Sequence, residues 1–318
     1  MPDYRLFGGV FRSELELPEL QPHPSLRARW WLSRNAAPLD PGDLHVLGSE
    51  DVAPGTRVTL YRSRSGFRLV FDDTGIFDLS RDGHRIRWTA PERLEIDDAR
   101  KDILGRVAAL CLELDGMSVL HGSAVHIDDA AIVFLAPKFH GKSTTAAALA
   151  DRGARLLADD LVAVTPDRVP RIAPGIPVVQ LWKDSAAHVA QRAASARGDG
   201  RSPKLQRGWD EAGRAAHAPA PFRAAYLLSP FAGDATRPIR RERLAPVAAS
   251  LALLGQAKIG ALLGSEWRSR MLLRLAEIAA TVPVYRLELP RDYARLDELT
   301  DTLLAWHASA GIGTSVSA

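Results

Sequence analysis

The stretch from Ala136 to Thr144 places a glycine, a lysine and two hydroxyl side chains between an apolar run and an alanine-rich segment. In a strand–loop–helix context, the first N–H groups of the helix and its dipole bind phosphate. Lys142 can neutralise the β and γ phosphates, and the Ser143 hydroxyl can ligate Mg²⁺. The stretch therefore predicts a site for ATP and Mg²⁺, with nucleotide contacts from Ala136, Pro137, Lys138, Phe139, His140, Gly141, Lys142, Ser143 and Thr144.

The start of this loop departs from the usual phosphate-binding motif. Ala136 stands where the first glycine is expected, and Pro137 removes one N–H donor. The methyl group of Ala136 obstructs the loop seriously only if φ is positive there. Lys138 and His140 are unusual at their positions, and each either contacts a phosphate or is solvated. The alternative interpretation is an ordinary Gly-Lys-Ser turn at the start of a helix.

Two adjacent carboxylates, Asp159 and Asp160, follow the next apolar run at the edge where the nucleotide is expected. Adjacent residues on a strand point to opposite faces, so we predict that the two carboxylates have different roles. One can accept the proton of an acceptor hydroxyl, and the other can hold Mg²⁺ or orient Lys142. A solvated turn is the alternative.

The elements that must position these residues follow from apolar periodicity. We predict a helix over 95–114, strands over 123–127 and 131–135, a helix over 143–152 and a continuing strand over 161–164. Later patterns predict strands at 222–228 and 284–289 and helices within 246–280 and 296–306. This order is typical of an α/β P-loop domain, which we place at residues 96–318.

The first half of the chain differs in character. Residues 57–62 and 67–71 carry the β-branched and aromatic residues of strands, separated by turn sequences. Trp30, Trp31 and Trp88 are most simply core or interface residues. We therefore predict a small β-rich domain over 1–95, with an accessory or substrate-recognition role.

Composition excludes several classes of protein. With 318 residues, 46% hydrophobic and 25% charged, the chain is expected to be globular. A formal charge of +3 is small for a nucleic-acid binder, so no nucleic-acid partner is predicted. The single cysteine, Cys111, lies in an apolar run and is expected to be a buried thiol. With neither a signal-peptide pattern nor a membrane-length apolar run, we expect a cytoplasmic protein with no membrane partner.

Four short motifs occur in a fixed order: His121-Gly122, Gly141-Lys-Ser-Thr144, Arg152-Gly153 and Leu157-Ala-Asp-Asp160. Together they resemble the C-terminal catalytic domain of the HPr serine kinase/phosphorylase family, including the spacing between the histidine, the lysine and the aspartates. Tyr4-Arg-Leu-Phe-Gly, Pro174-Gly-Ile-Pro and Pro283-Val-Tyr-Arg-Leu also resemble HPr-kinase-like proteins that modify peptides, among them kinases of lasso precursor peptides.

The resemblance implies an HPr-kinase-like serine kinase. It implies that Asp160 accepts the serine proton, that Lys142 and His121 are catalytic, and that Ser143 binds Mg²⁺. We add Asp159 as a second metal ligand and catalytic carboxylate. The family's Glu-x-Arg-Gly motif is replaced here by Arg171-Ile-Ala-Pro-Gly, so phosphorylase activity and HPr as acceptor are not implied.

The acceptor is predicted to be a serine on a peptide or small protein, and a homo-oligomer is left open. Residues 183–243 hold twelve Lys or Arg against six Asp or Glu. This segment is either a solvated surface or a loop that closes over the site and steers an acidic peptide. If the segment is such a loop, we predict substrate contacts from Arg197, Arg201, Lys204 and Arg207. A kinase of a small hydroxylated molecule and a nucleotide-sensing protein without turnover are the alternatives.

Overall fold

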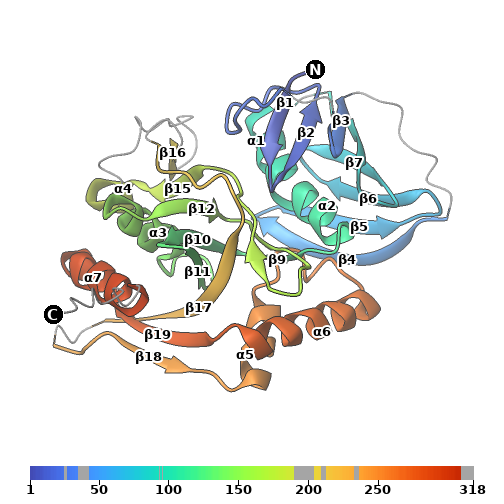
Figure 1. Cartoon of the computed structure of the whole chain (residues 1–318). Coiled ribbons are helices and arrows are strands. Elements are labelled where there is room, and N and C mark those ends of the chain that lie inside the picture. The colour runs from blue at the N-terminus through green and yellow to red at the C-terminus, as the bar shows by residue number, and fades with distance from the viewer. Residues whose placement is uncertain are drawn as a thin grey trace, which may run out of the picture.

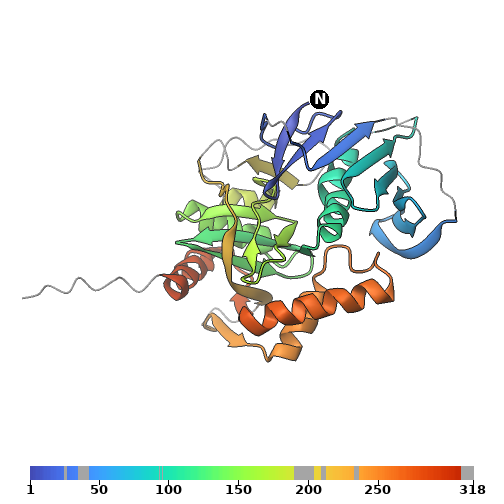
Figure 2. The same cartoon turned by 45° about the vertical axis from the view of Figure 1, so that its right-hand side comes forward.

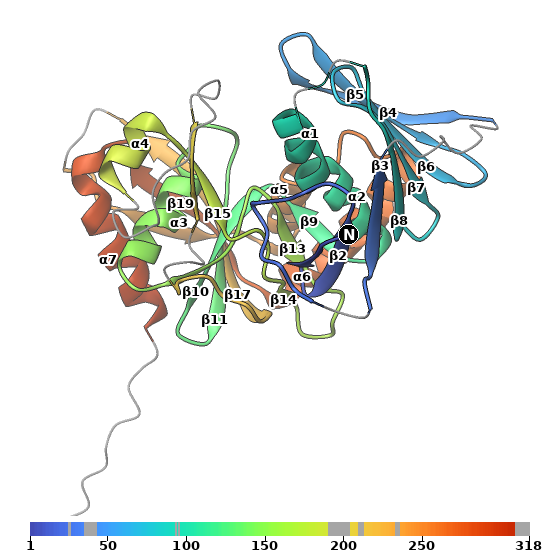
Figure 3. The ribbon, with the colours of Figure 1, turned by 90° about the horizontal axis from the view of Figure 1, so that it is seen from above.

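The computed structural model describes residues 1–24, 27–34, 43–92, 94, 96–189, 204–208, 213–232 and 236–308, with Lys204 and Arg207 described by their backbone alone. Its architecture is mixed α/β, with two large sheets and the helical segment of residues 96–114 between them (Figures 1 and 3).

The N-terminal sheet has eight strands in the order β1-β2-β3-β8-β7-β6-β5-β4. The strands are β1 Asp3–Leu6, β2 Gly9–Ser13, β3 Trp30–Arg34, β4 His45–Ala53, β5 Thr56–Arg62, β6 Gly66–Phe71, β7 Gly75–Ser80 and β8 Arg85–Thr89. From β4 to β8 the chain is an antiparallel meander whose alternate apolar side chains are buried on one face. Trp30 and Trp88 belong to this core, as predicted.

A helical segment packs on this sheet where one long helix was predicted. It consists of α1 Ile96–Asp102, a π turn η1 Ile103–Val107 and α2 Ala108–Leu114. Its apolar side chains share one core with the N-terminal sheet, and Cys111 is a buried free thiol as expected. The domain boundary at residue 95 therefore stays a prediction, because the helices that follow it pack on the sheet before it.

The second sheet has nine strands: β12, β10, β11, β17, β14, β13 and β9 follow one another, and β19 pairs with β17 and β18. Their bounds are β9 Ser118–Leu120, β10 Gly122–Ile127, β11 Ala130–Leu135, β12 Arg155–Asp159, β13 Val162–Val164, β14 Arg171–Ile172, β17 Ala220–Phe231, β18 Arg240–Arg243 and β19 Val284–Pro290. Every residue of β11 is buried, as expected for a strand covered on both faces.

Helices cover both faces of this sheet, and a small hairpin lies beside it (Figure 2). They are α3 Lys142–Asp151, α4 Lys183–His188, α5 Pro246–Gly255, α6 Ser265–Thr281, the 3₁₀ turn η2 Tyr293–Arg295 and α7 Leu296–His307. The hairpin pairs β15 Val178–Trp182 with β16 Lys204–Gly208. The predicted late strands and helices are confirmed as β17, β19, α5, α6 and α7.

The segment after α5 connects the two sheets. A Cβ at Gly48 of β4 would lie 2.5 Å from the carbonyl oxygen of Ala261, so the two backbones are in close contact. The rings of Phe67 and Trp267 are 5.5 Å apart. These contacts bring the loop that precedes α6 against the N-terminal sheet.

Asp102, at the junction of α1 and η1, gives a stability prediction. Burial raises its pKa to about 6, while the Thr74 hydroxyl donates to it at 2.6 Å. Between about pH 4 and 6 the folded chain keeps a proton that the unfolded chain loses, so this group reduces stability as pH rises through that window. We expect Asp102→Asn to raise the free energy of unfolding at pH 8 by at most about 3 kcal/mol.

This increase in the free energy of unfolding should disappear near pH 4, where the protonated Asp102 and the substituted Asn are both neutral. Thermal denaturation at pH 4 and pH 8 measures it. Asp184→Asn, an exposed aspartate on α4 far from Asp102 in the sequence, is the control. An equal effect at both pH values would contradict the account.

Candidate active site

The loop of residues 136–141 connects β11 to α3, which is the strand–loop–helix arrangement that the motif requires. Gly141 caps the helix with φ of 89°, a conformation that favours glycine, and a Cβ there would meet no atom within 4 Å. Glycine is therefore needed for its backbone conformation and not for lack of space around it. The N–H of Thr145 donates to the Gly141 carbonyl at 2.8 Å and starts the helix.

The two substitutions at the start of the loop are accommodated. Ala136 is fully buried and is not among the residues with positive φ, so its methyl group causes no backbone strain. The Lys142 ammonium donates to the carbonyl oxygens of Ala136 at 2.8 Å and Pro137 at 3.1 Å. It thus lies across the loop, where it can reach bound phosphates.

The tip of the loop presents an aromatic side chain to solvent. Phe139 has a φ of 69°, its side chain is 65% exposed, and its ring lies 5.2 Å from that of Trp182. His140 Nδ1 lies 2.8 Å from the Lys138 carbonyl oxygen. Contacts of Lys138 and His140 with phosphate stay predictions.

Asp159 lies at the buried end of β12, beside the loop. Its Oδ1 accepts hydrogen bonds from the Ser123 hydroxyl at 2.6 Å and the Ser143 hydroxyl at 2.8 Å, and its Oδ2 accepts from the Gln180 N–H at 3.2 Å. Burial raises the pKa of this carboxyl, and the two hydroxyls partly offset the effect. The predicted neighbours Asp159 and Ser143 are therefore in contact.

The Asp160 side chain points away from that of Asp159, as predicted, but strand alternation is not the cause. It has a φ of 65°, so the chain leaves strand geometry here. β12 pairs with β10, whereas β13 pairs with β9 and β14. The predicted continuous strand is wrong, and this left-handed residue separates the carboxylates in place of strand alternation. Asp tolerates such a conformation better than most residues.

Two side chains, His121 and Lys258, contact the Asp160 carboxylate. Its Oδ1 lies 3.1 Å from His121 Nδ1, and its Oδ2 accepts from the Lys258 ammonium at 2.6 Å. Burial alone would raise the pKa of Asp160, but Lys258 and then His121 outweigh it and hold the pKa well below its ordinary value. Because this side chain is 52% exposed, burial opposes the two partners less than it would at a closed site.

His121 sits between β9 and β10, with its N–H bonded to the Gln256 carbonyl at 2.7 Å. Its Nε2 is buried and has no partner in the described part of the chain. The predicted catalytic residues His121, Asp160 and Asp159 therefore lie together with Lys142 around one cavity of about 260 Å³.

Lys258 was missed by the sequence argument. It follows α5 in Gln256-Ala-Lys-Ile, with no motif around it. One signal was present: only six of the 41 basic residues are lysine, and four of these (Lys101, Lys138, Lys142 and Lys258) line the site and the cavity beside it. In an arginine-rich chain, each lysine was a candidate.

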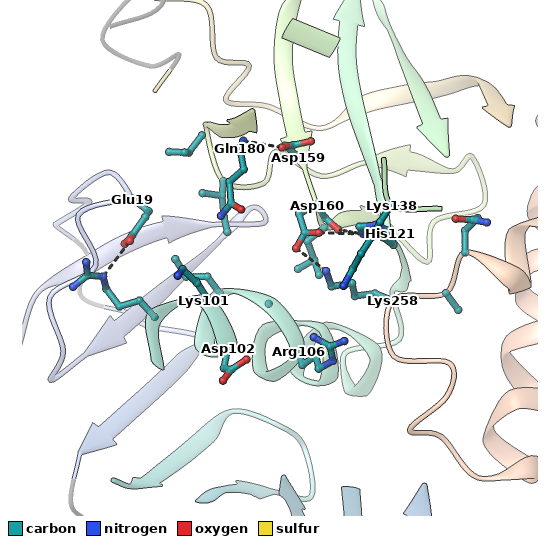
Figure 4. A pocket seen from close by; sticks show the side chains of 18 of the residues that line it. Glu19, Lys101, Asp102, Arg106, His121, Lys138, Asp159, Asp160, Gln180 and Lys258 are labelled. Carbon is teal, nitrogen blue, oxygen red and sulfur yellow. Dashed lines mark hydrogen bonds and ion pairs between the residues drawn. The ribbon is translucent and has the colours of Figure 1, made fainter. Parts of the chain in front are cut away.

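Three cavities follow one another across the site. The central one, of about 260 Å³, is lined by the loop and the two aspartates. On one side it shares Phe139 and Trp182 with a cavity of about 440 Å³ that extends to η2 and α7. On the other side it shares His121, Asp159 and Asp160 with a cavity of about 520 Å³ that extends to α1 and η1 (Figure 4). Among the described residues, the two outer cavities have no lining residue in common.

Contacts of the four predicted substrate residues with the site stay predictions. Arg197 and Arg201 lie outside the described residues, and Lys204 and Arg207 are described by backbone alone, opposite Trp182 and Val179 in the hairpin. In the described ranges, no three His, Cys, Asp or Glu side chains group as a metal site, and no helix has both the length and the apolar character to span a membrane.

Among known proteins, a likeness is found only to solved structures. No family model and no curated protein matches the chain. Among solved structures it is similar to the Hpr(Ser) kinase/phosphatase from Coxiella burnetii, with 15% sequence identity over 59% of this chain and 95% of that chain, at a TM-score of 0.30.

The Lys258–Asp160 pair gives a prediction on pH dependence. If Asp160 must be ionised for activity, removing the ammonium raises its pKa, and activity is then lost at a higher pH as acid is added. We expect Lys258→Met to move the acid limb of the pH–rate profile upward, while Lys258→Arg keeps it near that of the wild type. An acid limb that Lys258→Met leaves in place would argue against this role.

Proposed function

We propose that the chain is an ATP-dependent phosphotransferase that transfers the γ-phosphoryl group to a hydroxyl, with a peptide or small-protein serine as acceptor. The observation that carries this proposal is the cavity of about 260 Å³ lined by Lys142, Ser143 and Asp160. Phosphoryl transfer requires mainly positioning and charge stabilisation. A lysine and a helix N-terminus beside an ionised carboxylate provide both.

The nucleotide is proposed to lie along two of the three cavities. The triphosphate occupies the central cavity at the start of α3, where the first N–H groups of the helix can bind it. The nucleoside end then extends into the cavity of about 440 Å³, where Phe139 and Trp182 offer aromatic faces to a base.

Mg²⁺ fits the Asp159–Ser143 pair, which presents a carboxylate and a hydroxyl oxygen side by side. Mg²⁺ in phosphotransferases is commonly held by one or two carboxylates together with substrate phosphates, so a larger protein cluster is not required. When bound, the ion would neutralise charge on the phosphates.

Asp160 is proposed as the base. The acceptor oxygen forms a bond to the γ-phosphorus, the bond from that phosphorus to the β–γ bridging oxygen breaks, and the hydroxyl proton passes to the Asp160 carboxylate. ADP and the phosphate ester are the products. Lys258 keeps the carboxylate ionised, and His121 fixes its orientation.

Two other functions remain as alternatives. A small-molecule kinase would use the same loop and base, and the cavity of about 520 Å³ is of a size typical of small-ligand sites. A nucleotide sensor without turnover is supported by the missing Glu-x-Arg-Gly motif alone, since Ala136 causes no strain in the loop.

Lys142→Ala should reduce phosphoryl transfer by about 10²–10³-fold, because it removes the positive charge at the phosphates. ATP-dependent labelling of a serine peptide pool measures turnover, and titration with a fluorescent ATP analogue measures binding, which should weaken. Lys183→Ala, an exposed lysine on α4, is the control. Near-normal turnover in Lys142→Ala would remove this loop from the active site.

Asp160→Asn should lower turnover by about 10²–10⁴-fold while ATP binding is kept. Asparagine is chosen because it also tolerates the left-handed backbone at this position, so the fold should persist. Asp159→Asn should instead raise the Mg²⁺ concentration needed for half-maximal activity. If Asp159→Asn shows the first pattern and Asp160→Asn the second, the two roles are reversed.

A further inference from the structure

The cavity of about 520 Å³ adjoins the proposed phosphate site at Asp159 and Asp160, at His121 and Gln180, and at Lys138 of the loop. Beyond these shared residues, its walls come mainly from α1 and η1, the β15–β16 pair and the loop after α5, with Glu19 and Glu50 from the N-terminal sheet region. Figure 4 shows Asp102 and Arg106 across the cavity from Asp160, His121 and Lys258. An acceptor in this cavity would reach Asp160 from the side opposite the nucleotide.

The charged side chains that line the cavity balance in number, and three ion pairs join six of them. Five are basic (Arg100, Lys101, Arg106, Lys138 and Lys258) and five are acidic (Glu19, Glu50, Asp102, Asp159 and Asp160). The ion pairs are Arg100 with Glu19 at 3.1 Å, Arg106 with Glu50 at 3.0 Å, and Lys258 with Asp160 at 2.6 Å. Paired charges within the walls leave little net field for a strongly charged ligand. A polyanionic or polycationic acceptor therefore does not match this cavity.

Three glutamine amides are among the polar groups that the protein leaves unsatisfied there, together with His121 Nε2 and Glu19 Oε2. Gln180 and Gln206 are direct cross-strand partners in the hairpin, so their side chains share one face, and both line the cavity. Gln256 lines it from the loop after α5. All three are half-buried, and their side chains have no hydrogen-bond partner among the described residues. Each amide can both donate and accept.

We propose that this cavity binds the acceptor as an uncharged, extended peptide segment whose serine faces Asp160, with the glutamine amides bonded to its main chain. The inference rests on the proposed function and names its acceptor. A main chain offers alternating donors and acceptors, which matches amide side chains. No other described strand pairs with β16, and an extended peptide can add to such an edge.

A ring-shaped acceptor matches less well. No Phe, Tyr or Trp is found among the described residues that line the cavity, so a base or sugar ring has no aromatic face to stack on. Leu104, Ile176 and Val178 supply an apolar lining for small side chains next to the serine.

Pools of hexapeptides with one central serine test the proposal. The flanking residues are randomised among uncharged, acidic or basic residues, and glycerol and free serine serve as small hydroxyl acceptors. With the full chain and Mg·ATP, mass spectrometry measures phosphate incorporation. We expect the uncharged pool to give a KM at least about tenfold lower than the charged pools, because the basic and acidic side chains of the walls balance in number.

A preference for the acidic pool would overturn the proposal in favour of the basic residues between 197 and 207. Equal use of glycerol or free serine would overturn it in favour of a small-molecule site. If the wild-type chain neither binds ATP nor turns it over, the proposed function itself fails. If the chain binds ATP but does not phosphorylate the uncharged peptide pool, this inference is wrong while the proposed function can still hold.

Substitutions of the cavity glutamines test whether their amides bind the peptide. Gln206→Leu and Gln256→Leu should each raise the peptide KM by about two- to tenfold, the usual effect of one lost neutral hydrogen bond, with ATP binding retained. Gln21→Leu, an exposed glutamine outside the cavity, is the matched control. An unchanged peptide KM in both cavity variants would overturn the assignment.

Discussion

The left-handed backbone at Asp160 is the constraint on which the site depends. With a φ of 65°, this one residue ends β12, starts the chain towards β13, and directs neighbouring carboxylates to different partners. A non-glycine residue in a sparsely populated conformation costs on the order of 1–3 kcal/mol and persists only where its surroundings hold it. Here the ammonium of Lys258 and the ring of His121 do so.

Those surroundings depend on the N-terminal sheet. Lys258 belongs to the loop after α5, and the continuation of that loop packs on β4 at Gly48, where a Cβ would collide with the backbone of Ala261. The ring contact between Phe67 and Trp267 fixes the start of α6 on the same sheet. The N-terminal half therefore contributes a wall of one cavity and also supports the lysine that holds Asp160.

The predictable part of the site is the part encoded by neighbours in sequence. The loop, its helix, β11 and the aspartate pair lie within 130–160 and follow from short patterns. The features of the site that the sequence did not predict depend on the backbone conformation of Asp160 and on contacts between residues far apart in the chain. Apolar patterns report which residues are buried, but not the sign of φ at an Asp-Asp step. Lys258 lies 98 residues from its partner, and the pairing of Gln180 with Gln206 depends on a hairpin register.

The lowered pKa of Asp160 fits phosphoryl transfer better than most other proton chemistry. A carboxylate held well below its ordinary pKa is ionised at every physiological pH, but it is a weak proton acceptor. A reaction that needs early, complete deprotonation would be served poorly by it. The transition state of phosphoryl transfer is loose in most analyses, with little bond formation to the incoming oxygen, so the hydroxyl proton becomes acidic late. A carboxylate that is always available and fixed in direction then matters more than a basic one, and an ion pair to Lys258 gives the carboxylate both properties.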